Sequence, residues 1–303
     1  MARPVGLVLG AMAWLCPPYS QGQDLTGPLR DAVSVAATDT QASGPAATGS
    51  PSSPRPLPDD KLLYLVGAAL RSSPTYAGAQ DRNVRISPLW ALSYGRYRLS
   101  TGGANALLGY GAALGGSGAT ATLVKHQDLQ LNASLGLDGG RSASTDPRLA
   151  GLPDIRRTLT GRLGIGWSLT PAWSIGAGVT QDLLGRDSGT QIDTSLGYSW
   201  QATRHTRIVT GLTASFGDTI YMSSHFGVPL SAAGSSPLPA YQASAGLFNT
   251  AEGLGFTTTL TPHWLLYGGI GFAQLRGSAR HSPITQRPDS VSASIGLAYR
   301  CCR

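Results

Sequence analysis

Residues that could carry covalent chemistry are few in this chain. Asp187-Ser188-Gly189 places a hydroxyl beside a carboxylate, but a serine nucleophile needs a base within hydrogen-bond reach and an acid that orients the base. The candidate bases are His126, His205, His225, His263 and His281, none of which has such a context in the sequence. Asp-Ser-Gly is also a good tight-turn sequence. We therefore predict a turn at this position and no serine nucleophile.

Other kinds of reactive site are also poorly supported. Glu252 is the only glutamate, so a pair of carboxylates for glycoside hydrolysis would have to be aspartates. The closest pair, Asp59-Asp60, follows a proline-rich stretch. The histidines show no metal-ligand spacing, and no glycine-rich phosphate loop precedes a helix. We predict a protein that is not an enzyme and that has no cofactor and no metal.

Composition favours β-structure. Of 303 residues 40 are glycine, only 13% are charged, and Lys61 and Lys125 are the only lysines. Long helices usually carry Glu and Lys in quantity, so a helical protein is disfavoured. The net charge of +7 suits anionic lipid, polysaccharide or nucleic acid partners, or simply a mildly basic surface without a partner.

The N-terminal region is typical of an exported protein. Arg3, an apolar stretch from Val5 to Cys16 and the following Pro17-Pro18 predict a signal peptide over residues 1–22. Residues 23–60 are rich in Ala, Ser, Thr and Pro and predict a flexible lead-in. The remainder, 61–303, is expected to form one domain. Near its end, the adjacent Cys301 and Cys302 could close only a strained ring, so we expect no disulfide framework.

Strict alternation of apolar and small or polar residues recurs along this domain. In 157–169, Leu159, Leu163, Ile165 and Trp167 form one face, and Thr170-Pro171 then turns the chain into a second alternating segment. We predict twelve strands, at 61–72, 83–94, 96–111, 117–125, 128–138, 157–169, 172–183, 190–201, 204–216, 252–261, 264–275 and 289–299.

The connections between these strands alternate between very short and long. The long ones are 73–82, 112–116, 139–156, 184–189, 217–251 and 276–288. Transmembrane barrels have short periplasmic turns and longer outer loops. The sequence therefore predicts an all-β, antiparallel transmembrane β-barrel of about twelve strands in the outer membrane.

Two sets of side chains follow from this interpretation. An aromatic girdle beside the periplasmic turns is predicted from Trp167, Trp173, Tyr198, Trp200, Trp264 and Tyr299. Polar residues that point into the lumen by parity are Arg162, Thr180, Asp182, Asp193 and Arg207. They could form a mutually neutralised ladder that fills the barrel, or a polar path for small solutes.

Several short motifs together resemble the MipA/OmpV family of outer-membrane proteins. They include Pro74-Thr-Tyr-Ala-Gly78, Arg85-Ile-Ser-Pro88, Gly139-Gly-Arg141 and Leu149-Ala-Gly-Leu-Pro-Asp154, and their order extends over roughly residues 62 to 300. The positions that carry the resemblance are Pro74, Tyr76, Gly78, Pro88, Gly140, Arg141, Gly151, Leu152 and Asp154. In departure from the usual aromatic end of such barrels, Tyr299 is followed by Arg300-Cys-Cys-Arg303.

The resemblance implies a barrel that acts as a scaffold for murein-remodelling enzymes, namely a lytic transglycosylase and a murein synthase. Alternatives from the residues are a channel for small solutes and a surface or adhesion protein that uses the long 217–251 segment. Arginines in the outer loops, such as Arg141, Arg148 and Arg156, suit lipopolysaccharide phosphates, although solvation of the loops explains them as well. Nucleic acid is not expected as a partner of an exported barrel.

Overall fold

The chain folds into a closed antiparallel β-barrel, as predicted. The structure is a computed structural model that describes residues 62–101, 104–107, 118–232 and 234–301. The predicted signal peptide and lead-in lie outside these residues. The strands are β1 (Leu63–Pro74), β2 (Arg82–Tyr94), β3 (Tyr97–Ser100), β4 (Gly118–His126), β5 (Leu129–Asp138), β6 (Thr158–Ser168), β7 (Trp173–Asp182), β8 (Thr190–Gln201), β9 (Thr206–Gly217), β10 (Gly246–Thr259), β11 (Trp264–Leu275) and β12 (Asp289–Arg300).

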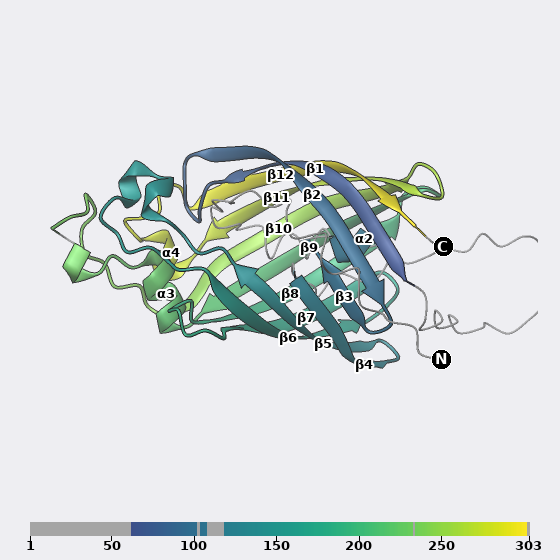
Figure 1. The fold of residues 1–303 in the computed structure, drawn as a ribbon, viewed down its shortest axis with the longest axis horizontal. Helices are drawn as coiled ribbons and strands as arrows, with labels where there is room; N and C mark the ends of the chain where they lie inside the picture. Colours follow the sequence, from purple (N-terminus) through teal and green to yellow (C-terminus); the bar gives the residue numbers. More distant parts are fainter. Residues whose placement is uncertain (1–61, 102–103, 108–117, 233, 302–303) are drawn as a thin grey trace, which may run out of the picture.

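Each strand pairs with its neighbours in the sequence, and β12 pairs with β1 to close the sheet. The two ends of the barrel differ (Figure 1). One end, which we call the short-turn end, carries tight connections such as Gly95–Arg96, together with the start of β1 and the end of β12. The other, the long-loop end, carries α3 (Thr219–Phe226) and α4 (Gly277–Arg280). This sorting of loops by length is the one predicted for short periplasmic turns and long outer loops.

The two faces of the wall have opposite character. Large apolar side chains are exposed on the outside, as at Ile86, Leu163 and Ile270. Polar side chains such as Asn132 and Ser215 are buried on the inside. Because side chains alternate along a strand, this arrangement places an apolar surface toward lipid and a polar lining toward the lumen. Within the described parts of the chain, no helix is both long and apolar enough to cross a bilayer.

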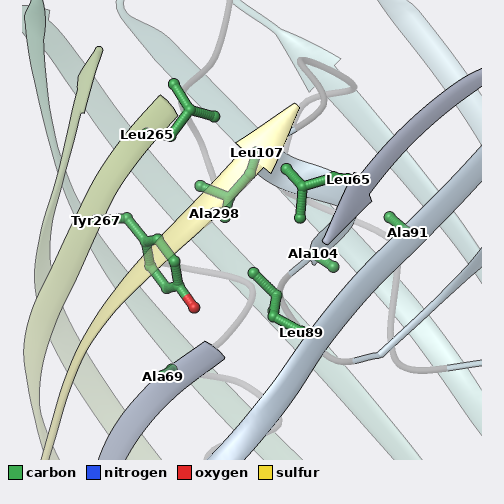
Figure 2. Packing of buried hydrophobic residues seen from close by; sticks show 9 residues of the cluster. All are labelled: Leu65, Ala69, Leu89, Ala91, Ala104, Leu107, Leu265, Tyr267 and Ala298. Carbon is green, nitrogen blue, oxygen red and sulfur yellow. The ribbon is translucent and has the colours of Figure 1, made fainter. Parts of the chain in front are cut away.

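The strand predicted over 96–111 is wrong at 104–107, and its positions 102–103 and 108–111 lie outside the described residues. β3 ends at Ser100, and α2 (Ala104–Leu107) follows. Ala104 and Leu107 are buried in one cluster with wall residues of four strands, β1, β2, β11 and β12, whose members are Leu65, Ala69, Leu89, Ala91, Leu265, Tyr267 and Ala298. Figure 2 shows these side chains converging on one region near the short-turn end. The chain therefore leaves the wall after β3 and packs an apolar turn inside the barrel.

The long segment predicted over 217–251 is also more ordered than expected. It contains α3, and β10 begins at Gly246 rather than at residue 252. Asp218 caps α3 because its carboxylate accepts a hydrogen bond from the backbone N–H of Tyr221 at 2.7 Å. The same segment contains the short 3₁₀ helix η3 (Leu230–Ala232), and two more, η1 (Ala143–Thr145) and η2 (Pro147–Leu149), lie in the loop between β5 and β6.

Two further details concern the edges of the sheet. β2 pairs with β3 only from Ala91 to Tyr94, so Pro88 lies where β2 pairs with β1 alone among the described strands. A residue without an N–H is best tolerated at such an edge. At the C-terminus, Cys301 is disulfide-bonded.

Candidate functional site

The loops at the long-loop end pack together into a structure that we call the cap. It comprises residues 75–81, 139–157, 183–189, 218–245 and 276–288. Two buried apolar clusters hold it together, one around Tyr76, Leu149, Leu152, Val228 and Ile284, the other around Met222, Phe226 and Phe248. Buried aromatic and aliphatic side chains of this size each contribute roughly 2 kcal/mol. The cap is therefore a packed unit in its own right.

Tyr76 ties three loops of the cap together. It is 1% exposed, and its hydroxyl accepts a hydrogen bond from Gln286 Nε2 at 2.7 Å. The same amide nitrogen also donates to Asp146 Oδ2 at 3.1 Å. Desolvation raises the pKa of the Tyr76 phenol, so the group stays protonated. A motif residue after β1 thus joins the loops that follow β5 and β11.

Arg141 connects the loop after β5 to α3. It is 4% exposed, and its Nη1 donates to the carbonyl oxygen of His225 at 2.8 Å and its Nη2 to that of Ser224 at 3.5 Å. These carbonyls belong to the last turn of α3, which has no intrahelical partners for them. Desolvation lowers the pKa of Arg141 to about 10. The guanidinium therefore remains charged at neutral pH and caps the negative end of the helix.

Glycine is required at two of the motif positions. Gly140 has φ +67°, and a Cβ there would lie 2.0 Å from the carbonyl oxygen of Ile155. Gly151 has φ +79°, and a Cβ there would lie 2.2 Å from the carbonyl oxygen of Ser235. Both positions combine a left-handed backbone with a close approach of a second loop, so only glycine fits them.

The other motif residues divide between the cap and the wall. Asp154 accepts hydrogen bonds from the backbone N–H of Ala143 at 2.6 Å and from the Ser142 hydroxyl at 3.2 Å. Leu152 is buried in the first cluster, and Pro74 is the buried last residue of β1. The carbonyl of Gly78 accepts the backbone N–H groups of residues 286 and 287. Pro88 alone of the motif positions lies away from the cap, in β2.

A half-buried tyrosine and a buried histidine form a pair at the base of the cap. The rings of Tyr221 and His225 stack with centroids 4.1 Å apart, and His225 Nδ1 lies 2.9 Å from the carbonyl oxygen of Tyr221. Desolvation lowers the pKa of His225 to about 4, partly offset by Asp138. It also raises the pKa of Tyr221. Both side chains are therefore neutral at pH 7, and Nδ1 of the imidazole is a donor.

An open pocket of about 730 Å³ lies in the cap. Three loops contribute to its lining, which includes Arg141, Asp154, Arg156, Arg186, Asp187 and Tyr241. This volume is within the range of small-molecule sites. The sequence analysis singled out Arg141 and Arg156 as outer-loop arginines but did not place them beside Arg186. Their approach depends on contacts between loops that are distant in sequence.

Three of the five predicted lumen residues come together inside the barrel. Arg162 Nη1 lies 3.0 Å from Thr180 Oγ1 and 2.6 Å from Asp193 Oδ2. The sequence analysis missed Gln191, which donates to Asp193 Oδ1 at 2.6 Å. The strand parity that selected Asp193 also places Gln191 on this face. These contacts form a neutral, hydrogen-bonded group across β6, β7 and β8.

The other two predicted lumen residues lie elsewhere. Asp182 ends β7 and accepts the backbone N–H groups of Leu184, Arg186 and Ser188, so it organises the following turn. Arg207 lies toward the short-turn end, with its Nε 3.3 Å from Gln201 Oε1. The five residues therefore do not form one continuous ladder.

The predicted girdle aromatics all lie close to the short turns, on the outward-facing side of the wall. Trp167, Trp173, Trp200 and Trp264 are exposed there. Trp173 and Tyr198 lie 4.7 Å apart between ring centroids, and Trp264 and Tyr299 lie 5.5 Å apart. The sequence analysis missed Tyr94 and Tyr97, which are also exposed at this end. Their position on either side of Gly95-Arg96 is the signal that identifies them.

The Asp187-Ser188-Gly189 motif lies in the turn that follows β7. Ser188 is buried in the turn after β7, and Asp187 beside it has φ 64°, as the predicted tight turn requires. Over the described residues, no group of three or more His, Cys, Asp or Glu side chains is placed to hold a metal ion.

The chain was compared with solved structures, with curated proteins and with protein families. Solved structures with a similar chain path include an outer membrane channel from Pseudomonas putida F1, at 12% identity and TM-score 0.43, covering 82% of this chain and 100% of that one. The toluene transporter TodX of Pseudomonas putida is 11% identical, with TM-score 0.37 and coverage of 80% and 90%. OmpT of Vibrio cholerae is 9% identical, with TM-score 0.37 and coverage of 80% and 97%. Likenesses this distant carry no argument about function.

No curated protein sequence matches the chain. A family model described as "MltA-interacting protein MipA" matches residues 66–301. The matched range runs from the fourth residue of β1 to the residue after β12 and includes every described loop of the cap. The chain therefore belongs to the MipA family of MltA-interacting proteins, and it is a barrel of the outer membrane.

Proposed function

We propose that this barrel is a non-enzymatic scaffold that holds murein-remodelling enzymes at the periplasmic face of the outer membrane. The observation that carries the proposal is the family match over 66–301, because the family is described by its interaction with MltA. The enzymes expected from the sequence are a lytic transglycosylase and a murein synthase. Lipid and lipopolysaccharide are the expected surroundings of the wall.

The form of the barrel supports a role in binding. The cap packs across the long-loop end, and α2 packs against the wall near the short-turn end. Both features fill space that an open channel would leave to solvent. The short-turn end presents exposed cations at Arg96, Lys125 and Arg204. Such a surface suits a protein partner that carries carboxylates.

A detergent pull-down from envelope membranes tests this proposal, with a tag inserted in the 23–60 lead-in. We expect recovery of a lytic transglycosylase or a murein synthase. Replacing Arg96 and Arg204 by glutamine should reduce that recovery. Replacing Arg280 by glutamine, an exposed arginine at the opposite end, is the matched control and should not. Recovery of an intact barrel without either enzyme would contradict the scaffold.

A channel for small solutes is the second candidate, because a polar lumen favours it. The contacts between Arg162 and Asp193 line one side, and Asn132 with Gln130 lines another, at 3.0 Å. Conductance in planar bilayers separates the two functions. A scaffold with a packed interior gives no steady conductance, whereas a channel gives reproducible open steps.

A further inference from the structure

The pocket in the cap has the features of an anion site. Its lining brings together Arg141, Arg156 and Arg186 from two different loops, with Ser223 and Gln242 from a third. Arg156 and Arg186 are exposed, whereas Arg141 is buried. The pocket thus has one fixed cation in its wall and two accessible ones.

Two of these arginines donate hydrogen bonds to neutral carbonyl groups, and Asp154 is the carboxylate whose charge acts on Arg141. Arg141 donates to two backbone carbonyls, and the side chain of Arg186 donates to the carbonyl of Arg157. Among the described residues, none of the three pocket arginines forms an ion pair with a carboxylate. A guanidinium that is desolvated without a counter-ion favours the binding of an anion.

The two carboxylates in the lining do not neutralise the pocket. Asp154 accepts hydrogen bonds from the backbone N–H of Ala143 and from the Ser142 hydroxyl, and its charge offsets part of that of Arg141. Asp187 lies in the turn after β7. Three guanidinium groups against two carboxylates leave an excess of positive charge. The remaining lining is largely uncharged and includes Val228 and Tyr241.

We propose that this pocket binds a phosphate group, carried by a soluble sugar phosphate or by lipopolysaccharide. Guanidinium groups bind phosphate through paired N–H donors, and a phosphate carries enough charge to engage more than one of them. About 730 Å³ leaves room for a sugar beside the phosphate. The site lies in the cap, at the end of the barrel opposite to the short turns proposed for enzyme binding, so it is independent of the scaffold.

Titration calorimetry of the full chain in detergent micelles tests the site, with inorganic phosphate and glucose 1-phosphate as probes. We expect saturable binding with a dissociation constant of about 1 mM or tighter. Arg156→Gln with Arg186→Gln should weaken it about tenfold or more, because each substitution removes a charge-assisted hydrogen bond to the phosphate. Arg280→Gln is the control, since this exposed arginine of α4 is not in the lining. Arg141 is left unchanged because it also caps α3.

A competition experiment separates the two sources of phosphate. If lipopolysaccharide in nanodiscs displaces glucose 1-phosphate, the ligand is the lipid. If it does not, the ligand is a soluble phosphate. Either result supports the site. The proposal is overturned if neither probe binds saturably, or if the double variant binds as tightly as the unchanged protein.

Discussion

The burial of His225 makes the cap sensitive to acid. This side chain is 5% exposed and is packed against Tyr221. Asp138 and Arg141 are the charged groups that act on it, in opposite directions. Desolvation is the largest effect and Arg141 acts in the same direction, so they outweigh Asp138 and the hydrogen bond to the Tyr221 carbonyl, and the pKa falls to about 4 in the folded cap. Once the cap opens, the imidazole returns to its ordinary pKa of about 6.5.

The sign and the size of the effect follow from proton linkage. Above about pH 6.5 the histidine is neutral in both states, so it adds no pH dependence. Between about pH 6.5 and pH 4 the open state binds a proton that the closed state does not, so the free energy of opening falls as the pH falls. One proton contributes about 1.4 kcal/mol per pH unit, which gives a loss of about 2 kcal/mol between pH 7 and pH 5. Aspartates titrate mostly below this window, so the histidine is the main contributor within it.

Hydrogen exchange of cap amides measures this loss, after correction for the intrinsic pH dependence of exchange. The unchanged protein should lose about 2 kcal/mol of protection between pH 7 and pH 5. His225→Gln should show a flat profile, because glutamine does not titrate. His281→Gln, at an exposed histidine beside α4, should keep the slope of the unchanged protein. A slope of the same size in the His225 variant would refute the reasoning.

Three other substitutions give separate results. Gly151→Ala forces a Cβ onto the carbonyl of Ser235 at a positive φ and should destabilise the cap by about 1–3 kcal/mol; limited proteolysis of the loops measures it. Glu252→Leu removes the only glutamate, which is exposed on the outward face between apolar neighbours. The substitution should raise the free energy of unfolding in liposomes by about 1 kcal/mol, measured by urea unfolding. A lower free energy of unfolding would instead reveal a partner for the carboxylate. Asp193→Asn removes the carboxylate 2.6 Å from Arg162 and should cost about 2 kcal/mol in the same unfolding assay.

The alternation of apolar and polar residues predicts the barrel, because one face of each strand contacts lipid and the other faces the lumen. Leu163 and Val179 pair on the lipid side, and Arg162 and Thr180 on the lumen side, so a period of two is visible without any knowledge of the partners. This local signal was sufficient to locate twelve strands and to sort the loops by length, although not to set the bounds of every strand. It fails for 96–111, because Leu107 packs against the inside of the wall. An apolar residue that faces lipid and one that fills the lumen have the same sequence signature.

The cap could not be predicted as a unit because its contacts are long-range. Tyr76 and Gln286 are joined by one hydrogen bond across 210 residues, and no local pattern encodes such a pair. The sequence analysis identified the motif residues as short sequence motifs, but it did not predict that most of them lie together in the cap. The structure explains Gly140 and Gly151 by backbone geometry and Arg141 by the carbonyls of α3. Only the helix itself had a local signal, the capping aspartate at position 218.

The cap and the proposed enzyme-binding surface lie at opposite ends of the barrel, so a substitution at one end should not change the property measured at the other. A strand of twelve residues such as β1 is about 40 Å long, or about 30 Å along the barrel axis at the tilt usual for barrels. A substitution in the cap therefore cannot contact a periplasmic enzyme at the short turns. Gly151→Ala should loosen the cap and leave the pull-down of murein enzymes unchanged, whereas Arg96→Gln with Arg204→Gln should do the reverse. Loss of the enzymes in the cap variant, with the barrel still folded, would mean that the two ends are coupled through the wall.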